Sequence, residues 1–303
     1  MLSLDTNLPV RTICPASPCP TGYAAGAFYF PANAPLANNA VWNTTDWFSQ
    51  GVSSYNGLEV DVNHRMAHGL QFRGAYTLSK ALDDGDNMNT SVATNSPAFV
   101  ANPLQPEADY GRASFDIRHS AVVNATYDLP FGHGNAIHGR PWVDRLIEGW
   151  QLSGIETVQS GLPFTPQLSY NPSNDGDTRN PVRPSWNPAF TGPVVLGLPG
   201  EYFNPNAFIP PLPGTYGNVG RNVLQGPVLA ELDLSLAKKF FLSERFNLQF
   251  RAESFNLLNR ANLNAPNPVV FTSARGGPSP TAGVITYTST SSRQLQFGLK
   301  LLW

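Results

Sequence analysis

Charged residues are scarce in this chain. Asp, Glu, Lys and Arg make up 13% of its 303 residues, whereas a typical globular domain contains about 25%. The formal net charge of −2 shows no basic surplus, so we do not expect a nucleic-acid partner. No run approaches the ~18 consecutive apolar residues of a membrane-spanning helix. The absence of such a run does not exclude a membrane β-barrel, because its strands alternate apolar and polar residues.

The sequence also lacks the short motifs of common enzyme and cofactor sites. It contains no G-x-S-x-G, G-x-x-x-x-G-K-[ST], H-E-x-x-H or C-x-x-C. His64 and His68 are four residues apart, but they lie across a predicted hairpin turn rather than on a helix, and His133 with His138 is an equally weak candidate for metal binding. We therefore predict that the chain is not an enzyme and holds no cofactor or metal. For the acidic residues 83–87, the sequence leaves two interpretations open, a calcium site and a solvated loop.

Cysteine is nearly absent, with Cys14 and Cys19 in C-P-A-S-P-C. On an exported loop they would form a small disulfide clip, and free thiols or a metal site are the alternatives. The residues after Met1 show neither the basic stretch nor the apolar core of a signal peptide. An exported chain of this kind is expected to be the C-terminal piece of a longer protein.

Glycine, proline and aromatic residues are abundant instead, with 26 glycines, 28 prolines and 11% aromatics. This composition favours an all-β protein with long loops. Residues 1–51 show no sustained alternation, and we expect them to form a loop region. The last eleven residues, R-Q-L-Q-F-G-L-K-L-L-W, place Leu or an aromatic residue at every second position. Such a stretch predicts a strand with one apolar and one polar face.

The same alternation recurs along the chain. A strand is predicted at residues 55–65, 69–80, 115–129, 150–160, 228–239, 245–254 and 293–303. The first two form a hairpin through a turn at residues 66–68, with Asp61 directly opposite Arg73. The fourth alternates poorly, and a bulge at Gly154 would keep Glu156 off the apolar face.

Connections between these strands alternate between short or moderate and long. Outer-membrane barrels have short periplasmic turns and long extracellular loops, so the pattern predicts an antiparallel transmembrane β-barrel. Charged side chains gather on one face of each strand, where a water-filled lumen would solvate them. The predicted lumen-facing residues are Glu59, Asp61, Arg73, Asp116, Arg118, Glu231, Asp233, Arg251, Glu253 and Lys300.

Several motifs in a fixed order then resemble one family. These are Y-N-G-L-E-V-D-V-N-H-R, Y-T-L-S-K, F-D-I-R-H-S, Y-D-L-P-F-G, G-W-Q-L-S-G, S-G-L-P-F-T-P, F-N-L-L-N-R-A-N and the terminal strand. Together they are similar to the C-terminal part of the β-barrel of TonB-dependent outer-membrane receptors. The Oar-like type, whose members carry a carboxypeptidase-regulatory-like domain, is the most similar group. The resemblance covers about residues 52–303.

The resemblance implies about seven C-terminal strands of a barrel of about 22 strands, located in the cell outer membrane. Its implied function is uptake of a bulky nutrient such as a siderophore, glycan or peptide. Implied partners are outer-membrane lipid, the barrel-assembly machinery, and an energy-coupling complex that acts through a missing N-terminal part. Leu299, Leu301 and Trp303 then form the C-terminal assembly signal.

Two alternatives remain, an exported β-rich binding or adhesion protein without a transport role, and a small self-contained outer-membrane barrel. Loop aromatic residues are expected either to contact a ligand or to pack on one another. They are Trp42, Trp47, Trp186, Tyr202 and Phe203.

Overall fold

The computed structural model describes residues 2–15, 19–42, 44–85, 100–132, 137–176, 182–241, 243 and 246–302. Within these ranges the regular structure is almost entirely β-strand. The long strands are β5 (Ser53–Ala67), β6 (Leu70–Asp83), β8 (His119–Asp128), β9 (Trp150–Gln159), β17 (Leu229–Phe241), β18 (Asn247–Phe255) and β20 (Gln294–Leu302).

Short elements occupy the connections between the long strands. The short strands are β1 (Leu2–Asp5), β2 (Thr12–Ile13), β3 (Phe28–Tyr29), β4 (Thr45–Phe48), β7 (Gly111–Arg112), β10 (Pro163–Phe164), β11 (Gln167–Leu168), β12 (Ser185–Trp186), β13 (Val195–Leu198), β14 (Glu201–Phe203), β15 (Phe208–Ile209), β16 (Leu224–Gln225) and β19 (Val269–Phe271). The helices are α1 (Pro141–Ile147) and two single 3-10 turns, Pro106–Asp109 and Pro205–Ala207. In the described part of the chain, no helix has the length and apolar character needed to span a membrane.

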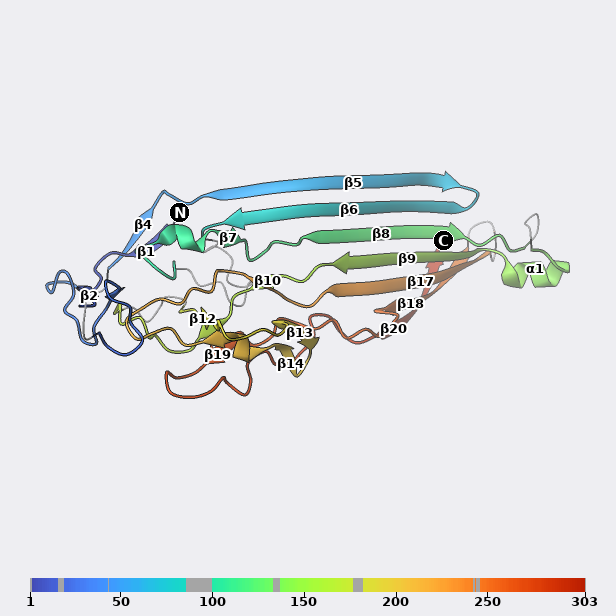
Figure 1. Cartoon of the computed structure of the whole chain (residues 1–303). Helices are drawn as coiled ribbons and strands as arrows, with labels where there is room; N and C mark the ends of the chain where they lie inside the picture. The colour runs from blue at the N-terminus through green and yellow to red at the C-terminus, as the bar shows by residue number, and fades with distance from the viewer. Residues whose placement is uncertain are drawn as a thin grey trace.

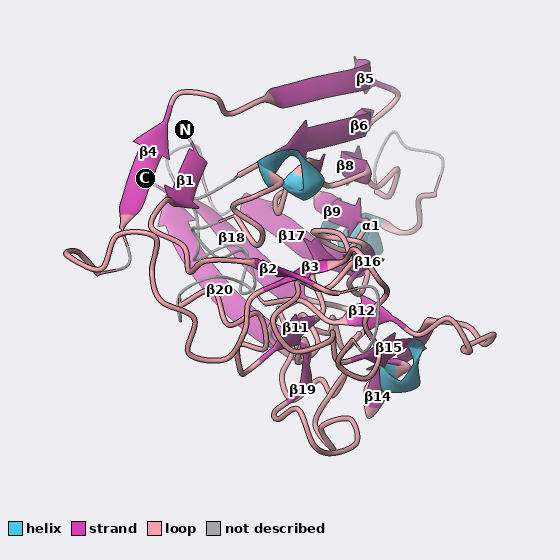
Figure 2. Ribbon diagram, turned by 60° about the vertical axis from the view of Figure 1, so that its left-hand side comes forward, coloured by secondary structure: helices cyan, strands magenta, loops and turns pink. Residues whose placement is uncertain are grey.

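The long strands form one antiparallel sheet in the order β20-β18-β17-β9-β8-β6-β5, with β7 added to β6. Apart from β7, each strand lies beside its neighbour in the chain, and Figure 1 shows them stacked side by side. Seen from a second direction, the sheet is curved (Figure 2). Among the described residues, β5 and β20 each pair with a single strand, so they are the two edges. The predicted all-β antiparallel class is confirmed.

The hairpin between β5 and β6 turns one residue later than the sequence predicted. His68 and Gly69 form the turn, and both have positive φ, 51° and 81°. A side chain on Gly69 would place its Cβ 2.8 Å from the carbonyl oxygen of Asp128, so glycine fits this site. Asp61 therefore pairs with Ala75 rather than with Arg73, and the predicted register was wrong by two residues.

The predicted bulge at Gly154 is also wrong. Strand β9 keeps a constant register against both β8 and β17. Glu156 therefore shares a face with Trp150 and Leu152, and it lies between Val123 and Leu232. Gly154 is explained instead by close packing, because a Cβ there would lie 2.7 Å from Cδ2 of Leu234.

The register of the sheet produces two distinct faces. One carries matched rows of apolar residues, and we call it the apolar face; we call the other the polar face. At the β20 edge of the apolar face, Leu295, Phe297 and Leu299 are 64%, 70% and 72% exposed. These side chains do not lie between two stacked sheets, which excludes a sandwich core at this position. A row of exposed apolar side chains is suited to an apolar environment rather than to water.

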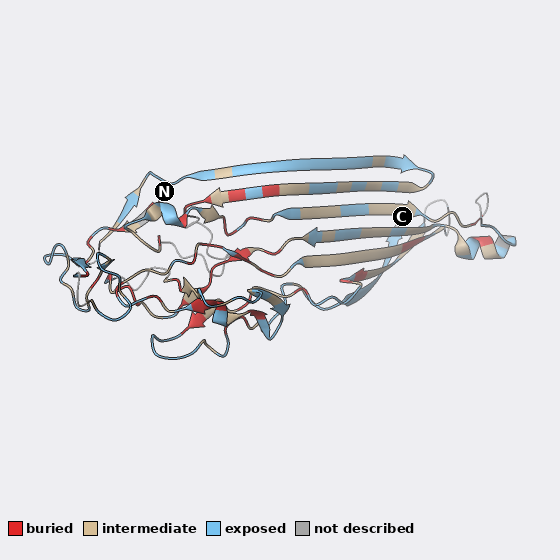
Figure 3. Cartoon of the chain, in the orientation of Figure 1, coloured by how far each residue is buried: buried red, intermediate tan, exposed pale blue. Residues whose placement is uncertain are grey.

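Buried residues concentrate at one end of the sheet. Figure 3 shows the long strands mostly exposed or intermediate and the buried residues mainly among the long connections. These connections, in the described parts of residues 1–52, 84–118, 160–228 and 256–293, are here called the loop layer. In its first part, β1 pairs with β4 and β2 with β3, within a region that the sequence predicted to be mainly loop.

Candidate functional site

Charged side chains of the polar face come from neighbouring strands. Eight of the ten predicted lumen-facing residues share this face by register, namely Glu59, Asp61, Arg73, Glu231, Asp233, Arg251, Glu253 and Lys300. Nε and Nη2 of Arg73 lie 2.9 and 2.8 Å from Oδ2 of Asp61, so this pair forms diagonally. Both side chains are exposed, so water screens the pair and it contributes little to stability. That this face lines a lumen stays a prediction.

Asp116 and Arg118 do not lie on a strand, because β8 begins at His119 rather than at Phe115. The predicted position of these two residues was wrong. Asp116 is buried in the segment before β8, where Oδ1 accepts a 2.7 Å hydrogen bond from the backbone N of Ala81. Its other oxygen lies 2.8 Å from Nε of Arg112. Asp116 therefore joins the loop layer to the end of β6.

The loop layer has an apolar core of its own. It is built from Phe164, Leu168, Tyr202, Phe203, Ala207, Phe208, Val219, Leu224, Val270, Phe271 and Ala282. Trp186 stacks on Phe208 with ring centroids 5.0 Å apart. Burying a large apolar side chain contributes about 1.5–3 kcal/mol, so this core fixes connections that are far apart in the chain. Among the loop aromatics, Tyr202 and Phe203 belong to this core and Trp186 packs against it, whereas Trp42 and Trp47 are exposed.

Two buried ion pairs hold the loop layer together and attach it to the end of β6. Arg183 pairs with Asp109 inside the loop layer, and Arg221 pairs with Asp83 on the polar face of β6. Nε of Arg221 also donates to the carbonyl oxygen of Asp109 at 2.9 Å. Burial lowers the pKa of Arg183, and the Asp109 carboxylate counters that shift. Removing one partner of such a pair leaves an uncompensated charge, which costs about 3–5 kcal/mol.

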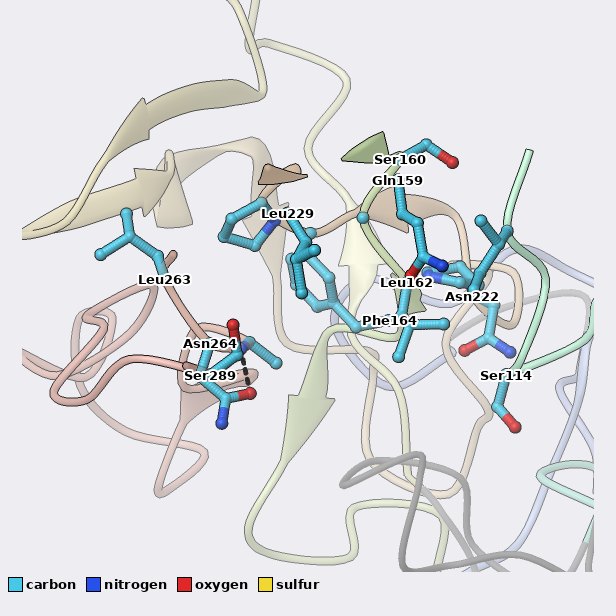
Figure 4. Close-up of a pocket in the computed structure, with 16 residues that line it drawn as sticks. Ser114, Gln159, Ser160, Leu162, Phe164, Asn222, Leu229, Leu263, Asn264 and Ser289 are labelled. Carbon is cyan, nitrogen blue, oxygen red and sulfur yellow. Dashed lines mark hydrogen bonds between the residues drawn. The ribbon is translucent and has the colours of Figure 1, made fainter. Parts of the chain in front are cut away.

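A cavity of about 170 Å³ lies where the loop layer meets the polar face. Ser114 and Ile117 come before β8, Gln159 ends β9, and Ser160 to Phe164 follow it. Asn222, Gly226 and Pro227 precede β17, and Leu229 begins it. Leu263 to Ala265 and Ser289 come from the last connection. Figure 4 shows Leu263, Asn264 and Ser289 on one side, Gln159, Ser160, Asn222 and Ser114 on the other, and Phe164 and Leu229 between them.

The polar groups of the cavity are held by neighbouring backbone and hydroxyl groups. Asn222 receives a hydrogen bond from Thr165 Oγ1 at 3.0 Å, and its Nδ2 donates to the carbonyl oxygen of Arg112 at 2.7 Å. Gln159 Nε2 donates to Ser120 Oγ at 3.4 Å, and among the described residues its Oε1 has no hydrogen-bond partner. The described residues that line the cavity include no charged side chain. It therefore suits a neutral polar group of about the size of one sugar ring or amide.

A buried tyrosine lies deeper in the loop layer. Tyr216 Oη donates to Oδ2 of Asp175 at 3.0 Å, and its ring meets that of Phe30 edge-on at 6.2 Å. Burial and, next, the negative charge of Asp175 raise the pKa of Tyr216 well above its ordinary value. The neutral phenol is therefore the form that the folded loop layer stabilises.

Other predicted residues lie apart from the cavity. Cys14 and Cys19 are joined by a disulfide, with Cα atoms 5.5 Å apart. In the acidic run 83–87, Asp83 pairs with Arg221, and Asp84 Oδ2 accepts a 2.8 Å hydrogen bond from Val52 N. Residues 86 and 87, like His133 and Trp303, lie outside the described residues. Groups of three or more metal-ligating side chains are absent from the described parts of the chain.

The sequence matches the outer membrane beta barrel domain family over residues 4–296. The chain therefore belongs to this family, and it is an outer-membrane protein whose strands lie in a lipid environment. Searches of the curated proteins and of the solved structures find no match.

Sequence reasoning did not predict the cavity or the ion pairs of Arg183 and Arg221. Their partners lie 74 and 138 residues away along the chain. No local pattern marks such distant pairs. The S-G-L-P-F-T-P motif was noted, and it turns out to supply Gly161 to Phe164 of the cavity wall.

Proposed function

We propose that this chain is the C-terminal part of the barrel of a TonB-dependent receptor, and that its loop layer binds a bulky nutrient. A neutral part of that nutrient enters the cavity between the loop layer and the polar face. The observation that carries the proposal is the position of this cavity. Long connections from one end of the sheet converge there, above the face that holds the charged side chains.

The open edges of the sheet support a larger barrel. In hydrocarbon, each unsatisfied backbone group costs several kcal/mol, so membrane sheets close on themselves. β5 and β20 therefore need partner strands beyond those described. The ordered motifs that resemble the Oar-like receptors point to the same arrangement.

The chemistry of the cavity supports a neutral ligand group. Gln159, Asn222 and Asn264 bring amides to its wall, and Phe164 and Leu229 bring apolar surface. A volume of about 170 Å³ is below the roughly 300–1,000 Å³ of pockets that enclose a drug-sized molecule. Only one part of a bulky nutrient would therefore enter, and a glycan or peptide fits better than an anionic siderophore.

The long connections would face the outside and the short ones the periplasm, as in other outer-membrane barrels. In this orientation the nutrient meets the loop layer first. The terminal strand, with Leu299, Leu301 and Trp303, would then be read by the barrel-assembly machinery from the periplasm. Energy coupling would act through the N-terminal part of the receptor.

The test compares uptake of three labelled probes by cells that express the natural full-length protein. The probes are a neutral glucose oligomer, a neutral oligopeptide and a ferric tricatecholate, which is anionic. We expect uptake of the glucose oligomer or the peptide, loss of uptake after a protonophore collapses the energy source, and weaker uptake by the Gln159→Leu variant. Gln249→Leu is the matched control, because Gln249 lies on the polar face away from the cavity.

Several outcomes would contradict the proposal. Binding without protonophore-sensitive uptake would favour an adhesion or binding protein. If Gln159→Leu and Gln249→Leu lowered uptake equally, the ligand would not bind in the cavity. Uptake of the anionic ferric tricatecholate alone would overturn the preference for a neutral ligand.

A further inference from the structure

Lys238 is a charged residue on the apolar face, and helix α1 covers it. In the register of β17, Lys238 lies between Trp150 of β9 and Phe250 of β18. Its side chain is only 2% exposed. Nζ donates to the carbonyl oxygens of Glu148 at 2.9 Å and Arg145 at 3.4 Å, and also to that of Leu146. The C-terminal end of α1 therefore lies over the apolar face.

The contacts of Lys238 explain why α1 lies there. Carbonyl groups at the end of a helix carry partial negative charge, so a cation is stabilised beside them. The ammonium group also lies 5.1 Å from the ring centroid of Trp150 and 4.9 Å from that of Phe240. Trp150 adds a hydrogen bond of 3.4 Å from Nε1 to the carbonyl oxygen of Leu146. The helix thus shields a charge that would otherwise face hydrocarbon.

The other side of α1 presents apolar and basic side chains. Trp142 and Leu146 are four residues apart, so they share one side of the helix, and they are 63% and 58% exposed. Arg140 and Arg145 beside them are exposed too. Trp concentrates at membrane interfaces, and Arg binds lipid phosphates. Exposed Trp and Leu with basic neighbours are the composition of a helix that lies in the interface.

The surface of α1 is continuous with the apolar face of the sheet. Tyr127, Trp150 and Phe240 lie at the end of that face where α1 packs, as in the aromatic girdle of membrane barrels. Figure 1 shows α1 at the end of the sheet opposite the loop layer. The lipid that meets the apolar face therefore also meets α1.

We propose that α1 lies in the headgroup region of the bilayer, where Trp142 and Leu146 insert beside phospholipid chains and Arg145 binds their phosphates. Lys238 holds the helix in this position. Only the choice of leaflet rests on the proposed orientation of the barrel, which places α1 in the periplasmic leaflet. The occupant of this surface is therefore a phospholipid rather than another protein.

The test uses a fluorescent label on a single cysteine, introduced as Leu146→Cys in the natural full-length protein with Cys14, Cys19 and any other cysteine replaced by Ser. The protein is refolded into vesicles of phosphatidylethanolamine and phosphatidylglycerol that contain a nitroxide lipid. We expect a nitroxide near the headgroup to quench the label more strongly than one deep in the acyl chains. Aqueous iodide should quench it weakly.

Two further label positions make the result decisive. A label at Leu299→Cys, on the apolar face of β20, reports insertion of the sheet, and one at Ala274→Cys, in an exposed part of the loop layer, reports water. Suppose that lipid quenches the label at Leu299→Cys, while iodide quenches the label at Leu146→Cys as strongly as the one at Ala274→Cys. The proposal for α1 is then overturned, but insertion of the sheet into lipid is supported. If lipid does not quench the label at Leu299→Cys, the proposal for α1 and the insertion of the sheet are both overturned.

A second variant tests the role of Lys238. With Lys238→Met, we expect quenching of the Leu146→Cys label by iodide to rise several-fold, because the helix loses the cation that holds its C-terminal carbonyl groups. Lys239→Met is the matched control, since Lys239 is exposed and lies on the polar face. If iodide quenched the Leu146→Cys label equally in Lys238→Met and Lys239→Met, Lys238 would not be the residue that holds the helix.

Discussion

Substitution of Leu234 by Arg is expected to destabilise the inserted sheet strongly. Leu234 lies at the middle of β17 on the apolar face, where its Cδ2 atom fills the space above Gly154. Arg on the lipid-facing side of a barrel costs about 2–4 kcal/mol near the bilayer midplane. That cost corresponds to a shift of roughly 30-fold to 1,000-fold in the unfolding equilibrium. Ser235→Arg is the matched control, because the next residue lies on the polar face beside Glu253.

The assay is a urea titration of each variant of the natural full-length protein, refolded into lipid vesicles and followed by tryptophan fluorescence. For Leu234→Arg, we expect the free energy of unfolding to fall by about 2–4 kcal/mol, whereas Ser235→Arg changes it by less than ~0.5 kcal/mol. Similar losses in the two variants would refute the assignment of the apolar face to lipid.

Three more predictions concern the loop layer and the apolar face. Arg221→Met removes the cation that pairs with the buried Asp83 carboxylate and should cost about 3–5 kcal/mol, seen as faster proteolysis of the loop layer; Arg251→Met, which breaks an exposed pair, should cost less than ~1 kcal/mol. Because the pKa of Tyr216 is raised, its contribution to stability is complete below about pH 10 and is lost as the pH rises further. Protease resistance should therefore fall with alkaline pH less steeply in Tyr216→Phe, and an unchanged slope would count against that role. Glu156→Leu should raise the urea midpoint, since it removes a carboxylate from the apolar face, and a lower midpoint would place Glu156 in a polar contact.

The alternation of side chains in the sequence was sufficient to predict roughly where the long strands lie and, outside β9 and the start of β8, which side chains share a face. Alternation reports burial on one side of a strand, and the matched rows of the sheet follow from it. Lys238 could have been found in the same way. Lys238 lies two residues after Leu236, so the alternation places it on the apolar face. There, only a partner such as the end of α1 can stabilise its charge.

Features that depend on turn geometry or on distant contacts were not predictable from the sequence. The register of the first hairpin depended on positive φ at His68, a residue type that does not signal such a turn. The third long strand begins late because Asp116 turns toward Ala81 and Arg112. Arg221 meets Asp83 only once the loop layer has folded onto β6.

The most direct test of the account is a scan of cysteine reactivity along β17. Residues 231–236 would be replaced one at a time, in the Cys14→Ser and Cys19→Ser background, and exposed to a water-soluble maleimide in intact outer membranes. The account predicts labelling at positions 231, 233 and 235, and protection at positions 232, 234 and 236. Equal labelling at all six positions would contradict the claim that one face meets lipid and the other meets water.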